Sequence, residues 1–298
     1  MAAPGIVPRR LWAARGLAWA SPPRSVSSRH LSATPRPALV LAHGFAGGEK
    51  FPLVPIEYFR DIEDGLHTAG YDDVFVADVP PFGTVKERAT KLVTQIHGWP
   101  GRRGLRVAVL AHSMGGLDAR YAISKLGGEG LVSTLLTVGT PHLGSPIADL
   151  LRHGLGWLNR PMGALKHVFS GGYDLTTEAC KAFSADVPDH PDVRYFSVAG
   201  NRGSMWRTSP ELWLSYRYIS EQRGPAGGGN DGLVSVGSAA WGIRLPDIDM
   251  DHAMQINFPH LGGRFARAPP SSRILDTWCS FADTVTQKGE PGPGHTQG

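Results

Sequence analysis

The sequence contains few cysteines, few charged residues and no long apolar segment. Its 298 residues include only Cys180 and Cys279, too few for a disulfide framework, although one bond between the two is compatible with the count. Neither belongs to a clustered Cys/His pattern of the kind that binds zinc. No apolar run approaches the roughly 20 residues that span a bilayer. The sequence therefore predicts no disulfide scaffold, no zinc site and no transmembrane segment.

Acidic residues are absent from residues 1–36, which contain six arginines. Without these six, the formal charge falls from +4 to −2, so the body of the chain lacks the basic excess of a nucleic-acid-binding protein. A leader rich in arginine, serine and alanine and free of acid is typical of mitochondrial targeting segments. A secretory signal with residues 18–20 as its cleavage site is the alternative, but Arg15 interrupts its apolar part. The sequence predicts a mitochondrial leader.

Glycine and proline are abundant, with 38 and 24 residues, and 41% of the residues are hydrophobic. An apolar fraction of this size in a chain of this length can form one large core. Glycine and proline alternate with polar residues at the end of the chain. We therefore predict a targeting or disordered leader over residues 1–36, one domain over residues 37–286 and a disordered tail over residues 287–298.

The most informative segment is Leu-Ala-His-Ser-Met-Gly-Gly around Ser113. An apolar, strand-like run over residues 105–111 precedes it and a helix-like run over residues 115–126 follows. Ser113 would therefore lie on a sharp strand-to-helix turn. Such a turn leaves no room for bulky neighbours two residues away, and Ala111 and Gly115 occupy those positions. This pattern indicates the nucleophile elbow of a serine hydrolase.

A glycine-rich loop follows another predicted buried strand, residues 38–42. The loop reads His-Gly-Phe-Ala-Gly-Gly, and a loop of this kind at the carboxyl end of a strand can direct backbone N–H groups into a site. We predict that the N–H groups of Phe45 and Met114 form the oxyanion hole, where negative charge develops on the carbonyl oxygen.

An acid and a histidine follow in the chain order of an α/β-hydrolase triad. Asp231 lies in the turn sequence Asn-Asp-Gly after a predicted strand over residues 193–199, and His252 follows 21 residues later. Asp231 would hold the imidazole of His252 in the tautomer that accepts the serine proton. The nearest competitor for the role of base is His260.

At this point the sequence resembles the bacterial true lipases, which are triacylglycerol lipases of the α/β-hydrolase superfamily. Six segments match in family order over roughly residues 37–260: Leu-Ala-His-Gly-Phe-Ala-Gly, His-Ser-Met-Gly-Gly-Leu-Asp-Ala-Arg-Tyr, Val-Gly-Thr-Pro-His-Leu-Gly-Ser, Val-Arg-Tyr-Phe-Ser-Val-Ala-Gly, Asn-Asp-Gly-Leu-Val and Asp-His. The resemblance implies an α/β-hydrolase fold, a central mostly parallel sheet flanked by helices. It carries Ser113, Asp231 and His252 over as the triad, with Phe45 and Met114 as the oxyanion positions.

The sequence departs from these lipases where they bind structural calcium. The family has an aspartate two residues after the triad histidine, and this chain has Met254 there. No aspartate lies between Ala199 and Asn230, the region expected to supply the other carboxylate. A hard cation requires several oxygen ligands, so we predict no calcium site. No cofactor is expected.

The resemblance places a small helical lid within residues 143–180. Ile147, Leu150 and Leu151 begin an apolar stretch at helical spacing that Pro161 interrupts, which predicts two short helices. A flap of this kind could shield the cleft in water and expose an apolar surface to lipid. The alternative is a pair of ordinary helices packed on the sheet.

The sequence thus predicts a serine hydrolase that cleaves carboxylic esters with apolar acyl chains, and triacylglycerol lipase is the best single description. A phospholipase or a lipid acyltransferase would use the same acyl-enzyme. A non-catalytic binding protein with this fold is the alternative from another class. The partners expected are a lipid or apolar ester and, transiently, a lipid surface.

Overall fold

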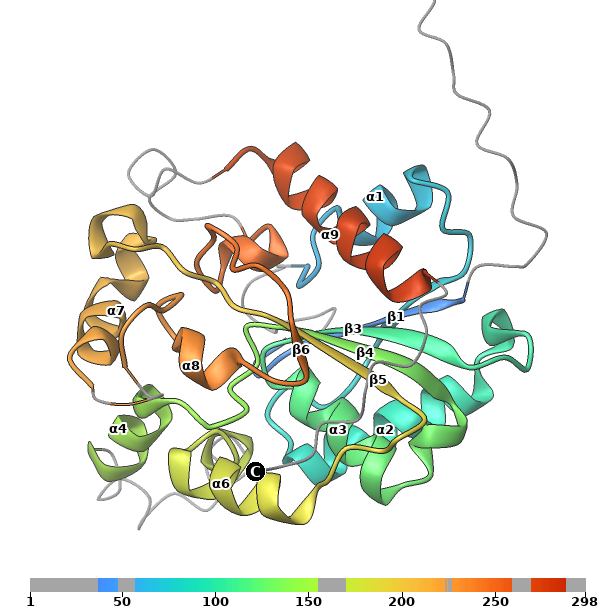
Figure 1. The fold of residues 1–298 in the computed structure, drawn as a ribbon, viewed down its shortest axis with the longest axis horizontal. Coiled ribbons are helices and arrows are strands. Elements are labelled where there is room, and N and C mark those ends of the chain that lie inside the picture. Colours follow the sequence, from blue (N-terminus) through green and yellow to red (C-terminus); the bar gives the residue numbers. More distant parts are fainter. Residues whose placement is uncertain are drawn as a thin grey trace, which may run out of the picture. The chain divides into compact units, whose positions relative to one another are not determined.

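The computed structural model describes residues 37–47, 57–154, 170–222, 224, 227–258 and 269–287 (Figure 1). The predicted leader over residues 1–36 lies outside the described residues, as do all of the predicted tail except Gln287, residues 155–169 of the predicted lid, and His260.

A parallel sheet forms the centre of the described part of the chain. Its six strands, in spatial order, are β2 (Val74–Ala77), β1 (Leu39–Ala42), β3 (Val107–His112), β4 (Val132–Val138), β5 (Arg194–Val198) and β6 (Ile243–Arg244). Every pairing of neighbours is parallel. Parallel neighbours require crossover connections. The predicted strands over residues 38–42, 105–111 and 193–199 are confirmed to within two residues at each end.

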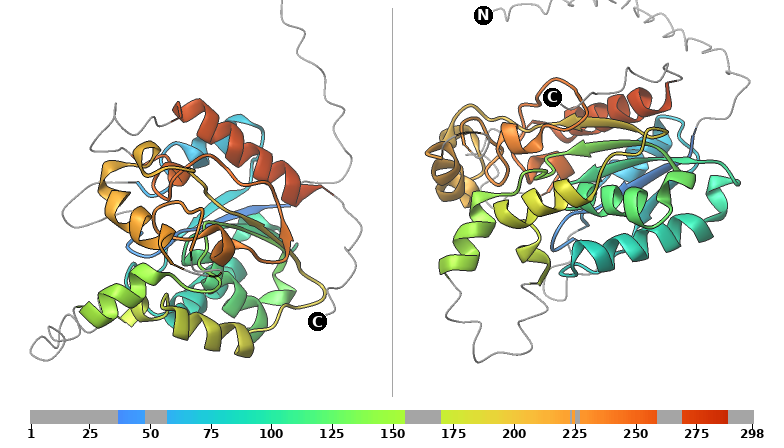
Figure 2. Two further views of the ribbon diagram at one scale, coloured as in Figure 1. Left: turned by 60° about the vertical axis from the view of Figure 1, so that its left-hand side comes forward. Right: turned by 60° about the horizontal axis from the view of Figure 1, so that its bottom comes forward.

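Helices cover both faces of the sheet (Figure 2). Helices α1 (Ile62–Thr68) and α9 (Ser271–Thr286) contact each other on one face, and α2 (Val85–Gly98) and α3 (Gly115–Lys125) contact each other on the opposite face. Side chains of β1 alternate between the two layers: Leu39 and Leu41 join the cluster with α1 and α9, while Val40 and Ala42 join that with α2 and α3. A strand buried on both faces explains the unbroken apolar run.

Local sequence accounts for the flanking helices. Helix α2 begins with a capping box, in which the Thr84 hydroxyl accepts from the Glu87 N–H and the Glu87 carboxylate accepts from the Thr84 N–H. Helix α9 is amphipathic, and its buried residues recur at helical spacing. They are Ile274, Trp278, Phe281, Ala282 and Val285.

The remaining helices include four α-helices that lie towards one end of the sheet (Figure 1). They are α4 (Pro146–Gly154), α6 (Thr177–Asp186), α7 (Trp213–Ser220) and α8 (Val236–Ala239). Single 3-10 turns are η1 (Pro100–Arg102), η2 (Gly128–Gly130), η3 (Met205–Arg207), η4 (Pro210–Leu212) and η6 (Met254–Ile256). Helix α4 is the first helix of the predicted lid, while the predicted second helix falls within residues 155–169, outside the described part.

The fold settles whether the two cysteines are bonded. Cys180 is buried beside Pro141 and Cys279 is half-buried on α9, and both are free thiols, so the disulfide that the count permitted is not formed. Among the described helices, none has the length and apolar character needed to cross a bilayer.

Candidate active site

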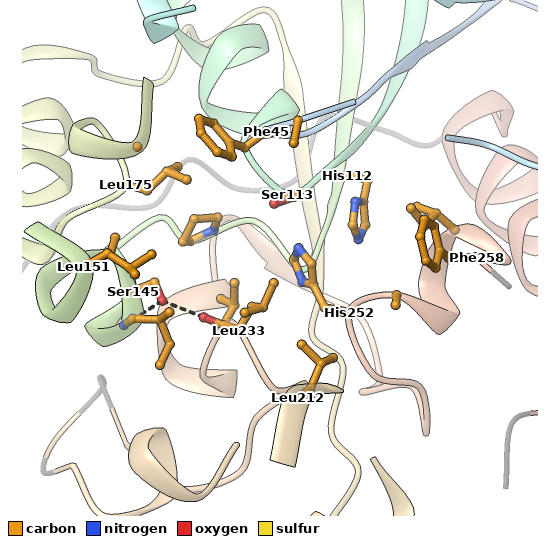
Figure 3. A pocket seen from close by; sticks show the side chains of 18 of the residues that line it. Phe45, His112, Ser113, Ser145, Leu151, Leu175, Leu212, Leu233, His252 and Phe258 are labelled. Carbon is orange, nitrogen blue, oxygen red and sulfur yellow. Dashed lines mark hydrogen bonds between the residues drawn. The ribbon is translucent and has the colours of Figure 1, made fainter. Parts of the chain in front are cut away.

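Ser113 lies on the turn between β3 and α3, with its backbone in a left-handed conformation. Its φ is +54°, a value that residues other than glycine seldom adopt. The turn is held because the Ser113 N–H donates to the carbonyl of Val138 at 2.9 Å and the Ser113 carbonyl accepts from the Thr140 hydroxyl at 2.7 Å. These contacts with the end of β4 direct the Ser113 side chain into a cavity (Figure 3).

Crowding around this turn explains the small residues of the motif. A Cβ atom at Gly115 would collide with the carbonyl oxygen of Ala42 and lie 2.8 Å from that of His43. A Cβ atom at Gly44 would lie 2.6 Å from the Cβ of Ser113. Helix α3 and the loop after β1 therefore approach each other more closely than any side chain at these positions allows.

The substitution Gly115→Ala is expected to lower the free energy of unfolding by about 1–3 kcal/mol, because its methyl group would meet backbone oxygens that cannot move independently. Urea unfolding measures the change. Gly98→Ala is the matched control, since it adds the same methyl group at the end of α2 with no atom within 4 Å, and should change stability by less than about 1 kcal/mol. Equal stability of the two variants would contradict the crowding argument.

The structure brings Asp231 and His252 together. The Nδ1 atom of His252 lies 2.8 Å from Oδ2 of Asp231, while Oδ1 of Asp231 accepts from the N–H groups of Leu233 and Val234 at 3.0 and 2.7 Å. A carboxylate only accepts, so Nδ1 of the neutral ring carries the proton and Nε2 is left as the acceptor. His252 and Ser113 line the same cavity, and Figure 3 shows the imidazole beside the serine.

One predicted oxyanion position shares the cavity with Ser113, and the other follows Ser113 directly in the chain. Phe45 follows β1 and lines the cavity, and Met114 is the N-cap of α3. Neither backbone N–H donates a hydrogen bond to any of the described residues. Amides at the start of a helix have no intrahelical acceptor, so the Met114 N–H is free to bind an anion.

A buried arginine that the sequence reasoning missed holds the loop that contains Phe45. Arg88 on α2 donates to the carbonyl oxygen of His43 at 2.7 Å and to that of Pro80 at 2.8 Å, and pairs with Asp118 of α3 at 2.8 Å. Burial raises the pKa of Asp118 to about 6, against the opposing effect of Arg88. One feature of the sequence indicates that Arg88 is buried: it falls on the apolar face of α2, between Val85 and Leu92.

The cavity that Ser113 and His252 share has a volume of about 660 Å³ and a mainly apolar lining. Such a cavity binds an apolar group and excludes water from the charges around it. Arg152 of α4 is its only lining residue with a permanent charge among the described residues. The apolar lining includes Phe45, Pro141, Ile147, Ala148, Leu151, Leu175, Leu212, Leu233, Val234, Ala253, Ile256 and Phe258.

Met254 stands where the bacterial true lipases have a calcium-binding aspartate, and in this chain it is part of the hydrophobic core. Met254 is fully buried and packs in the cluster with α9. The nearby carboxylate of Asp251 is occupied by protein donors, since it accepts from the N–H and hydroxyl of Ser209 at 2.8 and 2.6 Å and from the Met254 N–H at 2.9 Å. Within the described residues, no group of three or more His, Cys, Asp or Glu side chains could hold a metal ion.

Comparison with known proteins finds relatives along most of the chain. The family described as "Putative serine esterase (DUF676)" matches residues 39–182. "Triacylglycerol lipase 2" of Saccharomyces cerevisiae is 31% identical over 243 residues, which cover 78% of this chain and 69% of that protein. "Triacylglycerol lipase" of Vibrio cholerae is 30% identical over 278 residues, which cover 80% of this chain and 85% of that protein.

Solved structures agree on the fold. A metagenomic carboxyl esterase superposes with a TM-score of 0.67 at 19% identity, covering 92% of this chain and 82% of that chain. The predicted α/β-hydrolase fold, with a parallel sheet between two layers of helices, is therefore confirmed.

Proposed function

We propose a two-step acyl transfer for this chain, which belongs to the α/β-hydrolase family of triacylglycerol lipases and serine esterases. The chain is a carboxylic ester hydrolase. In the proposed first step, Oγ of Ser113 attacks the ester carbonyl carbon, Nε2 of His252 takes the hydroxyl proton, and the alcohol leaves with that proton. Water, deprotonated by His252, then releases the acid and restores Ser113.

Two further groups of this chain complete the proposed reaction. The N–H groups of Phe45 and Met114 donate to the oxyanion of each tetrahedral intermediate. The Asp231 carboxylate holds the ring of His252 and stabilises the imidazolium that forms. The observation that carries the proposal is the 2.8 Å contact between Asp231 and His252 at a cavity that also contains the strained Ser113.

We propose triacylglycerols as the substrates and the bacterial true lipases as the nearest subgroup. The apolar lining of the cavity favours a long acyl chain over a polar one. Two large apolar side chains that line it, Leu151 and Tyr173, are exposed, and so is Leu214 of α7, which is 86% exposed. Because α4 and α7 are in contact, these side chains favour transient contact with a lipid surface.

The alternative substrate class is a phospholipid, as donor for hydrolysis or for acyl transfer. One observation favours it: Arg152, whose guanidinium lies 4.4 Å from the centre of the Tyr173 ring and 2.8 Å from Glu178, lines the cavity. A cation there could bind an anionic head group. A non-catalytic binding role is disfavoured, because Asp231 and His252 are paired beside Ser113.

The experiment that tests the proposal compares substrates on the purified full-length chain. Hydrolysis of p-nitrophenyl esters with short and long acyl chains, of trioleoylglycerol and of phosphatidylcholine would be measured side by side. We expect higher kcat/KM for long chains and for the triacylglycerol. Preference for phosphatidylcholine would favour the alternative, and a folded chain inactive on all four would contradict ester hydrolysis by this site.

The substitution Ala148→Phe is expected to convert a long-chain preference into a short-chain one. Ala148 of α4 lines the cavity, so a phenyl ring there occupies the space of the distal acyl carbons. We expect kcat/KM for the long-chain ester to fall by about 10- to 100-fold and that for the short-chain ester to change by less than about threefold. Ala182→Phe on the exposed surface of α6 is the control, and should alter neither value.

We further propose that residues 1–36 direct the chain to mitochondria, a proposal supported by their six arginines and their lack of acidic residues. Fusion of residues 1–36 to a fluorescent protein in eukaryotic cells tests it. Mitochondrial fluorescence is expected, and export of the fusion into the medium would support the secretory alternative.

A further inference from the structure

Asp231 is the end of a chain of hydrogen bonds that does not include Ser113. Besides His252, its Oδ2 atom accepts from Nε2 of Gln255 at 2.9 Å. Oε1 of Gln255 lies 3.0 Å from Nε2 of His112, and Nδ1 of His112 lies 2.7 Å from the hydroxyl of Tyr58. Side chains from four separate segments are thus joined, and Asp231, Gln255 and His112 are all buried.

The direction of every hydrogen bond in this chain follows from the carboxylate. Asp231 only accepts, so the NH₂ group of Gln255 faces it and the amide oxygen of Gln255 faces His112. Nε2 of His112 must therefore carry a proton. Burial, and secondarily the adjacent His252, lower the pKa of His112 well below its usual value, so the ring is neutral and its Nδ1 accepts from the Tyr58 hydroxyl. All three donated hydrogens point towards Asp231, and aligned bonds of this kind strengthen one another.

The backbone leaves a slot for the Gln255 amide. A Cβ atom at Gly139, just after β4, would lie 2.5 Å from Oε1 of Gln255 and 3.0 Å from Oδ2 of Asp231. A Cβ atom at Gly200, after β5, would collide with Nε2 of Gln255. The backbone of Gln255 is also fixed, since its carbonyl oxygen accepts from Nε1 of Trp278 at 2.7 Å. The amide is therefore held in one orientation by two strand ends and by α9.

His112 also contacts the proposed base directly. The centres of the His112 and His252 rings lie 4.5 Å apart, with the ring planes inclined by 47°. His112 precedes Ser113 in the chain, so the residue before the nucleophile packs against the base and is linked by Gln255 to the acid. A displacement of the Gln255 amide would thus act on Asp231 and on the ring that supports His252.

We propose that Gln255, His112 and Tyr58 are positioning residues that orient Asp231 and His252 through one directional hydrogen-bond chain. The inference rests on the proposed function, because it assigns these side chains to the support of that acid and base. Gln255 supplies the second donor to Oδ2, which holds the carboxylate group in the orientation that faces His252. Tyr58 keeps His112 in the tautomer that donates to Gln255.

Two substitutions of Gln255 in the full-length chain test the proposal. Gln255→Leu removes both hydrogen bonds, and we expect kcat to fall by about 10- to 100-fold with KM within about twofold. The charge of Asp231 would then act on His252 undiminished, so the acid limb of the pH profile of kcat/KM should move to higher pH. A residue that only supported the fold would lower the amount of active enzyme without moving this limb.

Gln255→Glu provides a signature with the opposite pH dependence. The introduced carboxyl can donate to Asp231 only when protonated, and two carboxylates at this distance repel each other. Activity relative to that of the unaltered enzyme should therefore be highest at low pH and fall as the pH rises. Among the described residues, the titratable side chains of this hydrogen-bond chain and beside it are Asp231, His112, His252 and Tyr58, while the carboxylate of Asp251 is bonded to Ser209.

Two further variants complete the design. Tyr58→Phe removes the hydroxyl that donates to Nδ1 of His112. Combined with Gln255→Leu, it should lower kcat by less than the product of the two single effects, because both substitutions disrupt the same hydrogen-bond chain. Gln95→Leu, which removes two hydrogen bonds between Gln95 of α2 and the backbone of Asp78, is the control and should leave kcat and the pH profile unchanged. If Gln255→Leu fails to fold, Gln255→Glu and Tyr58→Phe carry the test.

The outcomes separate the two proposals. An active enzyme in which Gln255→Glu and Tyr58→Phe keep the unaltered kcat and pH profile would overturn the positioning chain and leave the proposed reaction intact. Activity that does not depend on Ser113 or Asp231 would overturn the proposed function itself.

Discussion

Replacement of Ser113 by alanine is expected to lower kcat for ester hydrolysis by about 10⁵- to 10⁶-fold, because it removes the only atom that can form the acyl-enzyme in the proposed reaction. The cavity and the amides proposed to bind the oxyanion remain, so KM should change little. The fold should also remain, since the Ser113 backbone, rather than its hydroxyl, makes the hydrogen bonds with Val138 and Thr140. Steady-state hydrolysis of a long-chain p-nitrophenyl ester measures the effect.

A fluorophosphonate probe gives an independent readout of the same assignment. Such a probe reacts with an activated serine and should label the unaltered chain at Ser113, with no labelling of Ser113→Ala. Ser280→Ala on the exposed surface of α9 is the matched control and should be labelled and active. Labelling of any other serine in the unaltered chain would remove Ser113 from the mechanism.

Replacement of Asp231 by asparagine is expected to lower kcat by about 10⁴-fold through the tautomer of His252. Asparagine retains one oxygen, which can still accept from the N–H groups of Leu233 and Val234, so its NH₂ group would face the imidazole. The ring would then accept at Nδ1 and carry its proton on Nε2, where the serine proton has to be received. Activity, together with the chemical shifts of the ring nitrogens by NMR, measures the two effects.

Asp251→Asn is the matched control for this substitution. Asp251 is also a fully buried acid and precedes His252, but its carboxylate bonds to Ser209 and to the backbone of Met254 rather than to the imidazole. We expect a lower unfolding temperature and a kcat within about tenfold of that of the unaltered chain. An equal loss of activity in Asp231→Asn and Asp251→Asn would contradict a specific role of Asp231, because any buried acid of this region would then have the same effect.

Local pattern was sufficient for the fold class and for the elements that surround Ser113. The apolar run that becomes β1 and the small residues at Ala111 and Gly115 each reflect a constraint acting over a few residues, namely burial on both faces of a sheet or crowding at a tight turn. The chain order of Ser113, Asp231 and His252 can also be read from the sequence. Residues that follow parallel strands are expected to meet, because such strands have their carboxyl ends at one edge of the sheet. These inferences required no knowledge of packing.

Other features depend on residues far apart in the chain. In the sequence Arg88 is one more cation of a helix. Only the packing of α2 against α3 and the loop after β1 buries it, so that it holds the loop that contains Phe45. The two cysteines illustrate the same limit, since their number permits a bond that their positions in the fold do not form.

The sequence by itself therefore determined which residues could form a nucleophile, an acid and a base, because each lies in a short motif with its own steric or chemical reason. Only the tertiary structure decided what surrounds them. Gln255 and His112 are 143 residues apart, and neither pattern nor spacing predicts that an amide will bridge the acid to the residue before the nucleophile. A hydrogen bond of this kind depends on the packed positions of two strand ends and α9, which no local segment of the chain specifies.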